Sequence, residues 1–280
     1  MGVKRVYTMK DKEGRPGVTR RASLWEALGF PLKEHMVLSF TGGGGKTSAM
    51  FALADELAGM GKHVLVTTST HIFYPEDRDV VLADRAETLE EFLKGREKWN
   101  SGCSGQVLVT GLPAGGGKLK GMDLKEMELL PDFADVLLIE ADGAKRLPLK
   151  LPRDGEPVIL DGTYGVIGCA GLDAIGGSWK EQCFRWELAE KVFGWQLENS
   201  RITPAQAAMV LKSSQGTRKG AESMEYRILL NKADNKSRIA NGVRIADALG
   251  EEWSGHCVMT SFLYRREGSE WKKKSSREVI

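Results

Sequence analysis

Four consecutive glycines followed by a lysine and a threonine are the residues with the clearest chemistry in this sequence. They lie in the segment SFTGGGGKTS, between an apolar run and a segment with helical spacing. Glycine lets the backbone turn tightly and brings its N–H groups close to an anion, and the positive end of a helix adds to that attraction. The pattern therefore predicts a phosphate-binding loop made of Gly42, Gly43, Gly44, Gly45, Lys46, Thr47 and Ser48.

Lys46 and Thr47 have separate roles in such a loop. Lys46 would reach the terminal phosphates of a nucleotide, and the Thr47 hydroxyl would ligate Mg²⁺. The standard pattern G-x-x-x-x-G-K-[ST] has a glycine where this chain has Phe40, so what remains is the shorter G-x-x-G-K-T. A Gly-rich surface turn is the alternative, and the strand-like and helix-like flanks argue against it.

Two carboxylates follow a buried strand pattern in DVLLIEADGAKRLPLK. The strand would deliver Glu140 and Asp142 to its carboxyl end, where ligands collect in open α/β sheets. One carboxylate there can hold Mg²⁺ through water, and the turn at Asp142 can sense a terminal phosphate. We expect both to be catalytic, with Glu140 joining Thr47 at the metal, although spacing leaves their separate roles open. An acidic turn without a catalytic role is the alternative.

The segment RILLNKADN ends another apolar run with the pattern N-K-x-D. The Asp234 carboxylate can accept hydrogen bonds from N1–H and the 2-amino group of guanine, which adenine does not offer. Lys232 would lay its aliphatic stem over the base, and Asn231 would tie this turn to the phosphate loop or to N7. The alternative is a polar turn at a strand end.

Several further residues have weaker signals. His71 can touch the phosphates or position a water, although a lone histidine is more often structural. Residues 114–121, AGGGKLKG, form a basic glycine loop that would either close over the site or be an ordinary flexible loop. Arg185 and Lys219 are candidate anion contacts, but solvated charge is the better interpretation for both.

Short apolar, β-branched runs alternate with helical patterns along the chain. An alternation of this kind predicts a parallel-rich sheet covered on both faces, a three-layer α/β fold like that of P-loop NTPases. The expected helices include one that begins at Thr203, where Gln206 completes a capping box. The expected strands lie at 36–40, 63–68, 80–83, 106–110, 135–140, 164–168, 226–231 and 256–260.

The chain divides into three parts. We expect a loosely ordered N-terminal extension at residues 1–35, in which 23–28 form a short helix, and an α/β domain at 36–262. Residues 180–220 would form a mostly helical excursion from that domain, and residues 263–280 a basic C-terminal tail.

The amino-acid composition argues against two classes of binding partner, nucleic acids and membranes. Forty basic against 38 acidic residues leave a net charge of +2, without the clustered positive charge of a nucleic-acid-binding protein. The chain has no apolar run of membrane-spanning length, and its four cysteines lie far apart without a CxxC pair. We therefore expect a cytoplasmic protein that binds neither nucleic acid nor membrane.

Together with VTTSTHI, KLKG and EPVI, these motifs resemble in type and order the YqeC family of accessory proteins for selenium-dependent molybdenum hydroxylases. The resemblance runs from about residue 36 to 260. It implies a role in maturing or inserting the cofactor of a hydroxylase, with that enzyme or another maturation protein as partner. We expect binding of GTP, or else ATP, with Mg²⁺ and slow hydrolysis. The alternatives are an ATP-dependent kinase- or ligase-like enzyme and a non-hydrolysing scaffold that carries the cofactor.

Overall fold

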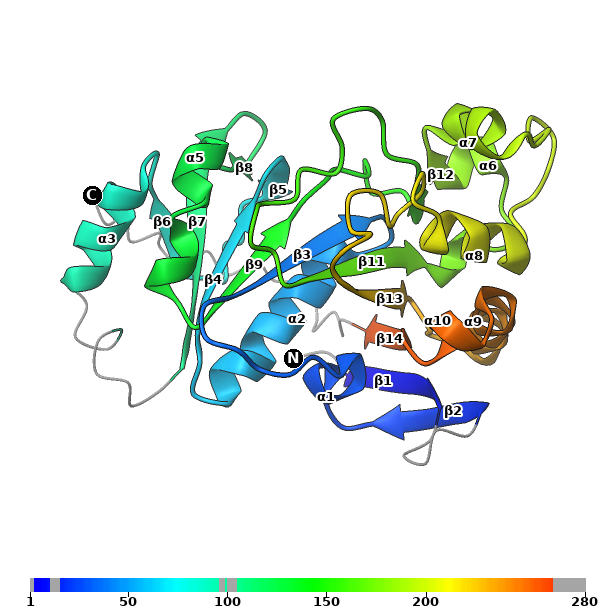
Figure 1. The fold of residues 1–280 in the computed structure, drawn as a ribbon, viewed down its shortest axis with the longest axis horizontal. Helices are drawn as coiled ribbons and strands as arrows, with labels where there is room; N and C mark the ends of the chain where they lie inside the picture. The colour runs from blue at the N-terminus through cyan, green and yellow to red at the C-terminus, as the bar shows by residue number, and fades with distance from the viewer. Residues whose placement is uncertain (1–2, 11–15, 96–98, 100–104, 264–280) are drawn as a thin grey trace, which may run out of the picture.

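One mixed sheet runs through the whole structure, a computed structural model that describes residues 3–10, 16–95, 99 and 105–263. Twelve strands of this described part form the sheet in the order β2-β1-β14-β13-β11-β3-β9-β4-β7-β8-β5, with β6 beside β7 (Figure 1). The strands are β1 (Val3–Lys10), β2 (Pro16–Arg21), β3 (Met36–Gly42), β4 (His63–Thr68), β5 (His71–Phe73), β6 (Val80–Leu82), β7 (Gln106–Ala114), β8 (Lys118–Lys120), β9 (Val136–Glu140), β11 (Gly165–Gly171), β13 (Glu225–Asn231) and β14 (Cys257–Leu263).

The central strands, from β14 to β7, pair in parallel, whereas β1, β2, β8 and β5 extend the sheet antiparallel at its two edges. Every residue of β3 and β9 is buried, as expected for parallel strands covered on both faces. The α/β class and the mostly parallel sheet are confirmed.

Helices cover both faces of the sheet. Helices α1 and α2 pack on one face, and the other carries α8 and α9 over β11 and β13, with α3 and α5 over β4 and β9 (Figure 1). The longer helices and the N-terminal one are α1 (Leu24–Leu28), α2 (Lys46–Gly59), α3 (Ala86–Lys94), α7 (Trp186–Phe193), α8 (Pro204–Lys212) and α9 (Lys236–Leu249); the short ones are α5 (Leu124–Met127), α6 (Trp179–Gln182) and α10 (Glu251–Ser254).

The N-terminal residues differ from the expected loose extension. Strand β1 pairs with β14 from Val3 to Thr8, and β2 pairs with β1, so both belong to the main sheet. Val6 is buried in the same core cluster as α1 and α2. The sequence pattern missed these strands because they lie at an edge and carry many polar residues, so their alternation is weak.

The region 180–220 contains α6, α7 and α8, together with the two-stranded pairing of β10 (Leu149–Lys150) with β12 (Cys183–Phe184). Thr203 and Gln206 form the expected capping box of α8. The C-terminal tail from residue 264 lies outside the described residues, and the domain limits stay a prediction. Across the described helices, none has the length and apolarity needed to cross a bilayer.

Candidate functional site

The glycine loop lies at the carboxyl end of β3, in the middle of the sheet, and leads directly into α2. Strand β9 lies on one side of β3 and ends at Glu140, while β11 lies on the other side and is followed in the sheet by β13. The parallel strands therefore bring the glycine, acidic and N-K-x-D motifs to the same edge, as their positions after strands predict.

Close packing explains why glycines occupy this loop. Gly42, Gly44 and Gly45 have positive φ angles of 87°, 72° and 102°. A Cβ on Gly42 would lie 2.3 Å from the carbonyl oxygen of Cys169, and one on Gly44 would lie 2.0 Å from the nitrogen of Gly171. The loop is therefore pressed against the end of β11 and is not a flexible linker.

Three loop amides already have acceptors within the protein. Gly43 donates to the Cys169 carbonyl at 2.9 Å, and Gly44 donates to the Leu147 carbonyl at 3.0 Å. The Gly42 amide donates to the Asp142 carboxylate at 3.1 Å. The amides available to an anion are accordingly those at the start of α2, because the first N–H groups of a helix have no acceptor within it. Gly45 is exposed there, and Thr47 and Ser48 are half-buried.

Lys46 is turned toward the acidic motif. Its ammonium lies 3.0 Å from Asp142 Oδ1 and 3.7 Å from Glu140 Oε1, and donates to the Gly42 carbonyl at 2.6 Å. Only 4% of the Lys46 side chain is exposed. Burial would lower the pKa of Lys46, but the two carboxylates outweigh it and raise the pKa above its usual value. The ammonium therefore stays charged.

Thr47 and Glu140 form a pair of oxygen ligands. The Thr47 hydroxyl donates to Glu140 Oε2 at 2.5 Å, and both side chains stand beside the start of α2. Burial raises the pKa of Glu140, although Lys46 and Thr47 oppose that effect. A cation near Glu140 would favour its charged form.

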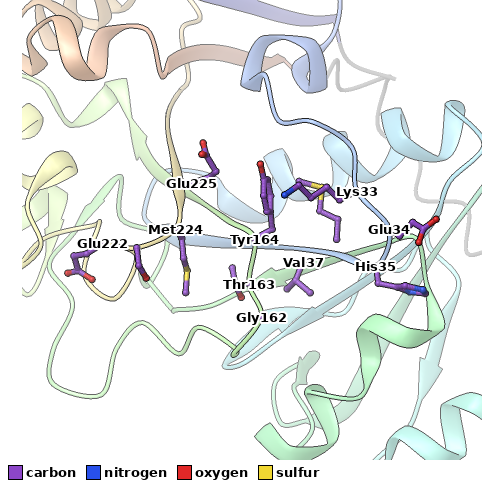
Figure 2. A pocket seen from close by; sticks show the side chains of 12 residues that line it. Lys33, Glu34, His35, Val37, Gly162, Thr163, Tyr164, Glu222, Met224 and Glu225 are labelled. Carbon is purple, nitrogen blue, oxygen red and sulfur yellow. The ribbon is translucent and has the colours of Figure 1, made fainter.

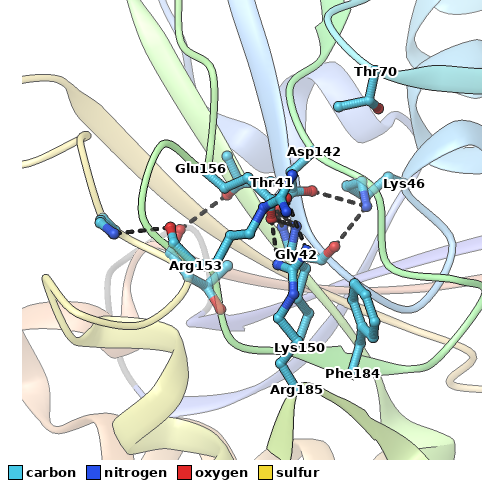
Figure 3. Close-up of polar contacts among 12 residues, drawn as sticks. Thr41, Gly42, Lys46, Thr70, Asp142, Lys150, Arg153, Glu156, Phe184 and Arg185 are labelled. Atoms are coloured by element: carbon cyan, nitrogen blue, oxygen red, sulfur yellow. Dashed lines mark hydrogen bonds and ion pairs between the residues drawn. The ribbon is translucent and has the colours of Figure 1, made fainter. Parts of the chain in front are cut away.

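A chain of alternating charges continues from Asp142 away from the loop (Figure 3). Lys150, which is 1% exposed, lies 3.0 Å from Asp142 Oδ2 and 2.6 Å from Glu156 Oε2. Arg185 binds Glu156 with both of its terminal nitrogens, at 2.6 and 2.9 Å. Burial would raise the pKa of Glu156, but Arg185 and Lys150 outweigh it and lower the pKa to about 2. Glu156 is thus a permanent anion at neutral pH.

The N-K-x-D turn approaches the glycine loop through Asn231. A Cβ on Gly45 would lie 3.3 Å from Asn231 Nδ2, which is buried and has no hydrogen-bond partner among the described residues. Lys232 pairs with Asp173 at 2.6 Å. Asp234 accepts from Ser261 Oγ at 2.6 Å and from Arg238 at 2.8 Å. The turn is thus anchored to α9 and β14, and the side-chain amide nitrogen of Asn231 faces the glycine loop.

Of the weaker candidates, Arg185 takes part in these contacts, and the others have different partners. His71 is exposed on β5, where it pairs with Lys120 of β8. Residues 114–121 belong to the β7–β8 hairpin, in which Leu112 to Ala114 pair with 118–120. Lys219 donates to the Arg153 carbonyl at 3.0 Å. Arg185, interpreted from sequence as solvated charge, is instead tied to Glu156.

The donor set fits Mg²⁺ together with a phosphate group. Among the described residues, no cluster of three or more His, Cys, Asp or Glu side chains could hold a metal by itself. Mg²⁺ usually keeps several waters and takes one or two protein oxygens plus substrate phosphates, which the Thr47 hydroxyl and the Glu140 carboxylate can complement. The unpartnered amide of Asn231 is a further polar group available to a ligand at this edge.

A hollow of about 680 Å³ lies at the opposite edge of the sheet, at the amino ends of β3, β11 and β13 (Figure 2). Lys33 stands over the ring of Tyr164, 4.1 Å from its centroid, and both line the hollow. Because the motifs gather at the carboxyl edge, we place the candidate site there and not in this hollow.

Lys150 and Glu156 were missed as site residues in the sequence. Lys150 stands in the apolar run LPLKLP, between Leu149 and Leu151, and a lysine so placed is a signal of burial beside a carboxylate. Glu156 follows six residues later in a stretch without periodicity, and nothing local indicates that it meets Lys150.

The fold and this edge define an α/β protein with a glycine loop, two buried carboxylates and two buried lysines at the carboxyl ends of parallel strands. A family profile described as YqeC protein matches residues 38–187, which is more than half of the chain. The chain therefore belongs to the YqeC family. The matched residues include the glycine loop and the charges from Glu140 to Arg185, and they end before Asn231.

A relative from Escherichia coli strain K12, described as uncharacterized protein YqeC, is 32% identical over 173 residues. The match covers 58% of this chain and 62% of the relative, so the chain aligns with less than two thirds of the relative's length. No solved structure matches the chain significantly.

Proposed function

We propose that this protein binds a nucleoside triphosphate, GTP in preference to ATP, together with Mg²⁺, and hydrolyses it slowly. The observation that carries the proposal is the start of α2, where accessible amides, the Lys46 ammonium and the Thr47–Glu140 pair meet at the end of a central parallel strand. This combination supplies both the positive groups for phosphates and the oxygens for a divalent cation.

Catalysis in this proposal is positional and electrostatic. Lys46 turns from Asp142 to the terminal phosphates, while Thr47 and Glu140 hold Mg²⁺, whose charge helps to neutralise the transferred phosphate. Asp142 then orients the attacking water. The released ammonium is the group that senses whether a terminal phosphate is present.

Asp234 retains capacity for a guanine base. A carboxylate has about four lone-pair sites, and Ser261 and Arg238 use two of them. The remaining two can accept from N1–H and the 2-amino group of guanine. Because Asn231 stands beside Gly45, base and phosphate binding would be coupled through one contact.

The biological role that we propose rests on the resemblance of the sequence motifs to accessory proteins for selenium-dependent molybdenum hydroxylases. We propose that nucleotide binding drives a conformational step in maturing or inserting the cofactor of a selenium-dependent molybdenum hydroxylase in the cytoplasm. The Gly44–Leu147 hydrogen bond supports such a step, since it joins the glycine loop to the segment after Asp142 and would pass a movement of the loop to that segment.

Two alternatives have observations in their favour. The internal hydrogen bonds of Gly43 and Gly44 favour a non-hydrolysing scaffold that carries the cofactor, because the loop is already satisfied without nucleotide. The two protein partners of Asp234 favour an ATP-dependent kinase- or ligase-like enzyme, in which N-K-x-D is only a strand-end turn.

Calorimetric titration with GTP, GDP, ATP and ADP in Mg²⁺ tests the proposal, using wild type, Lys46→Ala and Asp234→Asn. Hydrogen bonds to charged groups contribute about 1.5–3 kcal/mol, so Lys46→Ala should weaken triphosphate binding roughly 10- to 100-fold or more. Asp234→Asn should remove the preference for guanine. Lys191→Ala and Asp247→Asn, at exposed positions, are matched controls.

Phosphate release with and without a molybdenum hydroxylase completes the experiment. Release that requires Lys46 supports the proposal. Nucleotide binding without phosphate release, with or without the hydroxylase, would favour the scaffold. A preference for ATP that does not change in Asp234→Asn would favour the kinase- or ligase-like enzyme. Unchanged hydrolysis in Lys46→Ala would refute the assignment of the active site.

A further inference from the structure

The second buried lysine, Lys150, has no role in the proposed reaction as described so far. Its ammonium is 0% exposed and contacts the same carboxylate as Lys46, so the two oxygens of Asp142 are divided between two lysines. Burying an ammonium is costly unless it is paired. We therefore expect the positive charge of Lys150 to have a function at this position.

The two lysines differ in their surroundings. Lys46 stands at the first turn of α2, beside the half-buried residues that would meet a phosphate. Lys150 is held by Glu156 at 2.6 Å, and its backbone pairs with Phe184 in β12. In the proposed reaction Lys46 is thus the mobile cation, which leaves Asp142 for the phosphate, and Lys150 is the fixed one, which stays.

Asp142 needs the fixed cation once the mobile one leaves. The Asp142 side chain is 2% exposed, and without Lys150 a turn of Lys46 toward a phosphate would leave its carboxylate buried with only the Gly42 amide. An uncompensated buried charge is strongly disfavoured. Lys150 and the Gly42 amide both contact Oδ2, so Oδ1 is the oxygen that becomes free.

We propose that Lys150 is a positioning residue that holds the Asp142 carboxylate by Oδ2 and presents Oδ1 to the attacking water when Lys46 engages the nucleotide. Glu156, fixed in turn by Arg185, keeps Lys150 in place (Figure 3). This inference rests on the proposed hydrolysis and assigns to Lys150 a larger effect on turnover than on nucleotide affinity.

The test compares wild type, Lys150→Met, Lys150→Arg and the exposed control Lys191→Met. Nucleotide affinity and stoichiometry are measured by titration with GTP and Mg²⁺, and phosphate release is expressed per bound nucleotide. Misplacing a catalytic group can cost on the order of a hundredfold, so Lys150→Met should lower turnover per bound nucleotide about 10- to 100-fold. Its Kd should rise by a smaller factor than its turnover falls, since part of the lost stabilisation of Asp142 already appears when Lys46 leaves it to bind the nucleotide. The turnover of Lys150→Arg should lie between that of wild type and that of Lys150→Met.

Turnover per bound nucleotide separates positioning from a structural defect, which reduces the number of binding sites but leaves each intact site active. If Lys150→Met does not fold, Glu156→Gln tests the inference instead. It removes the negative charge that holds Lys150 and keeps the shape of the residue 156 side chain. A folded Glu156→Gln whose turnover falls by a larger factor than its Kd rises supports the inference. Wild-type turnover in either folded variant, or equal losses of affinity and turnover, overturns it. No hydrolysis by wild type overturns the proposed function as well.

Discussion

Asp142 accepts a hydrogen bond from the Gly42 amide and forms ion pairs with the Lys46 and Lys150 ammonium groups. Its neighbour in the charge chain, Glu156, is bound by Lys150 and by both terminal nitrogens of Arg185. Each anion in this row lies between cations. The alternation makes burial of these charges tolerable, because every one of them has an opposite charge within ion-pair distance.

At the residue scale, Glu156→Gln should reduce the free energy of unfolding by roughly 1–2 kcal/mol at pH 7, after allowance for solvent screening. The folded pKa of about 2 lies below the usual 4.5, so this stabilisation is complete above pH 4.5 and is lost as the pH falls toward 2. Urea unfolding at a series of pH values should show the difference from wild type shrinking over that range.

The matched control is Glu198→Gln at an exposed position, which should change stability by less than about 0.5 kcal/mol. A Glu156→Gln difference that stays constant down to the lowest pH at which both proteins fold would contradict the assigned ion pairs.

At the scale of elements, the glycine loop depends on its fit between β11 and the segment that follows β9. Gly44 donates to Leu147 on one side, and its Cα approaches Gly171 on the other. Lys145 and Arg146, just before Leu147, both have positive φ angles, of 48° and 65°. Residues other than glycine rarely adopt this conformation, so the segment is held there by its surroundings.

Gly44→Ala should disrupt this fit. The new Cβ would overlap the Gly171 nitrogen at a residue with φ +72°, so we expect a loss of about 2–4 kcal/mol in unfolding free energy. Nucleotide binding should be lost with it. Thermal denaturation and the GTP titration measure the two effects.

Gly59→Ala, at the other end of α2, is the control. A Cβ there meets nothing within 4 Å, and alanine favours helix, so stability should be unchanged or up to about 1 kcal/mol higher. Equal behaviour of the two variants would show that the loop is not packed as described.

At the scale of the whole molecule, one sheet joins the N-terminal strands to the strands that carry the candidate site. Strand β1 pairs with β14, β14 with β13, and β13 with β11, which flanks the glycine loop strand β3. The core cluster that contains Val6 also contains residues of α2 and β3. The N-terminal residues are therefore part of the folding unit that positions the loop.

Val6→Ala should lower the unfolding free energy by about 1.5–3 kcal/mol, because Val6 is 1% exposed and its truncation leaves a cavity. Val18→Ala, on β2 with 43% of the side chain exposed, should change it by less than about 0.5 kcal/mol. Chemical denaturation of both variants checks this, and equal stabilities would contradict a buried β1.

The sequence by itself determined the local features of this protein. The apolar runs predicted the parallel strands, Thr203 and Gln206 predicted a capped helix, and the spacing after strands placed the three motifs at one sheet edge. These signals depend on near neighbours in the chain and on the rule that parallel strands share a carboxyl edge. The guanine preference and the hydrolysis remain predictions.

Only the tertiary structure decided which distant groups meet. The Arg185–Glu156 pair, the approach of Asn231 to Gly45 and the pairing of β1 with β14 join residues far apart in sequence. No periodicity encodes such contacts, because they arise from the order of strands in the sheet and from the packing of segments against it. For the same reason the internal hydrogen bonds of the glycine loop could not be predicted from the sequence, because their acceptors come from two other parts of the chain.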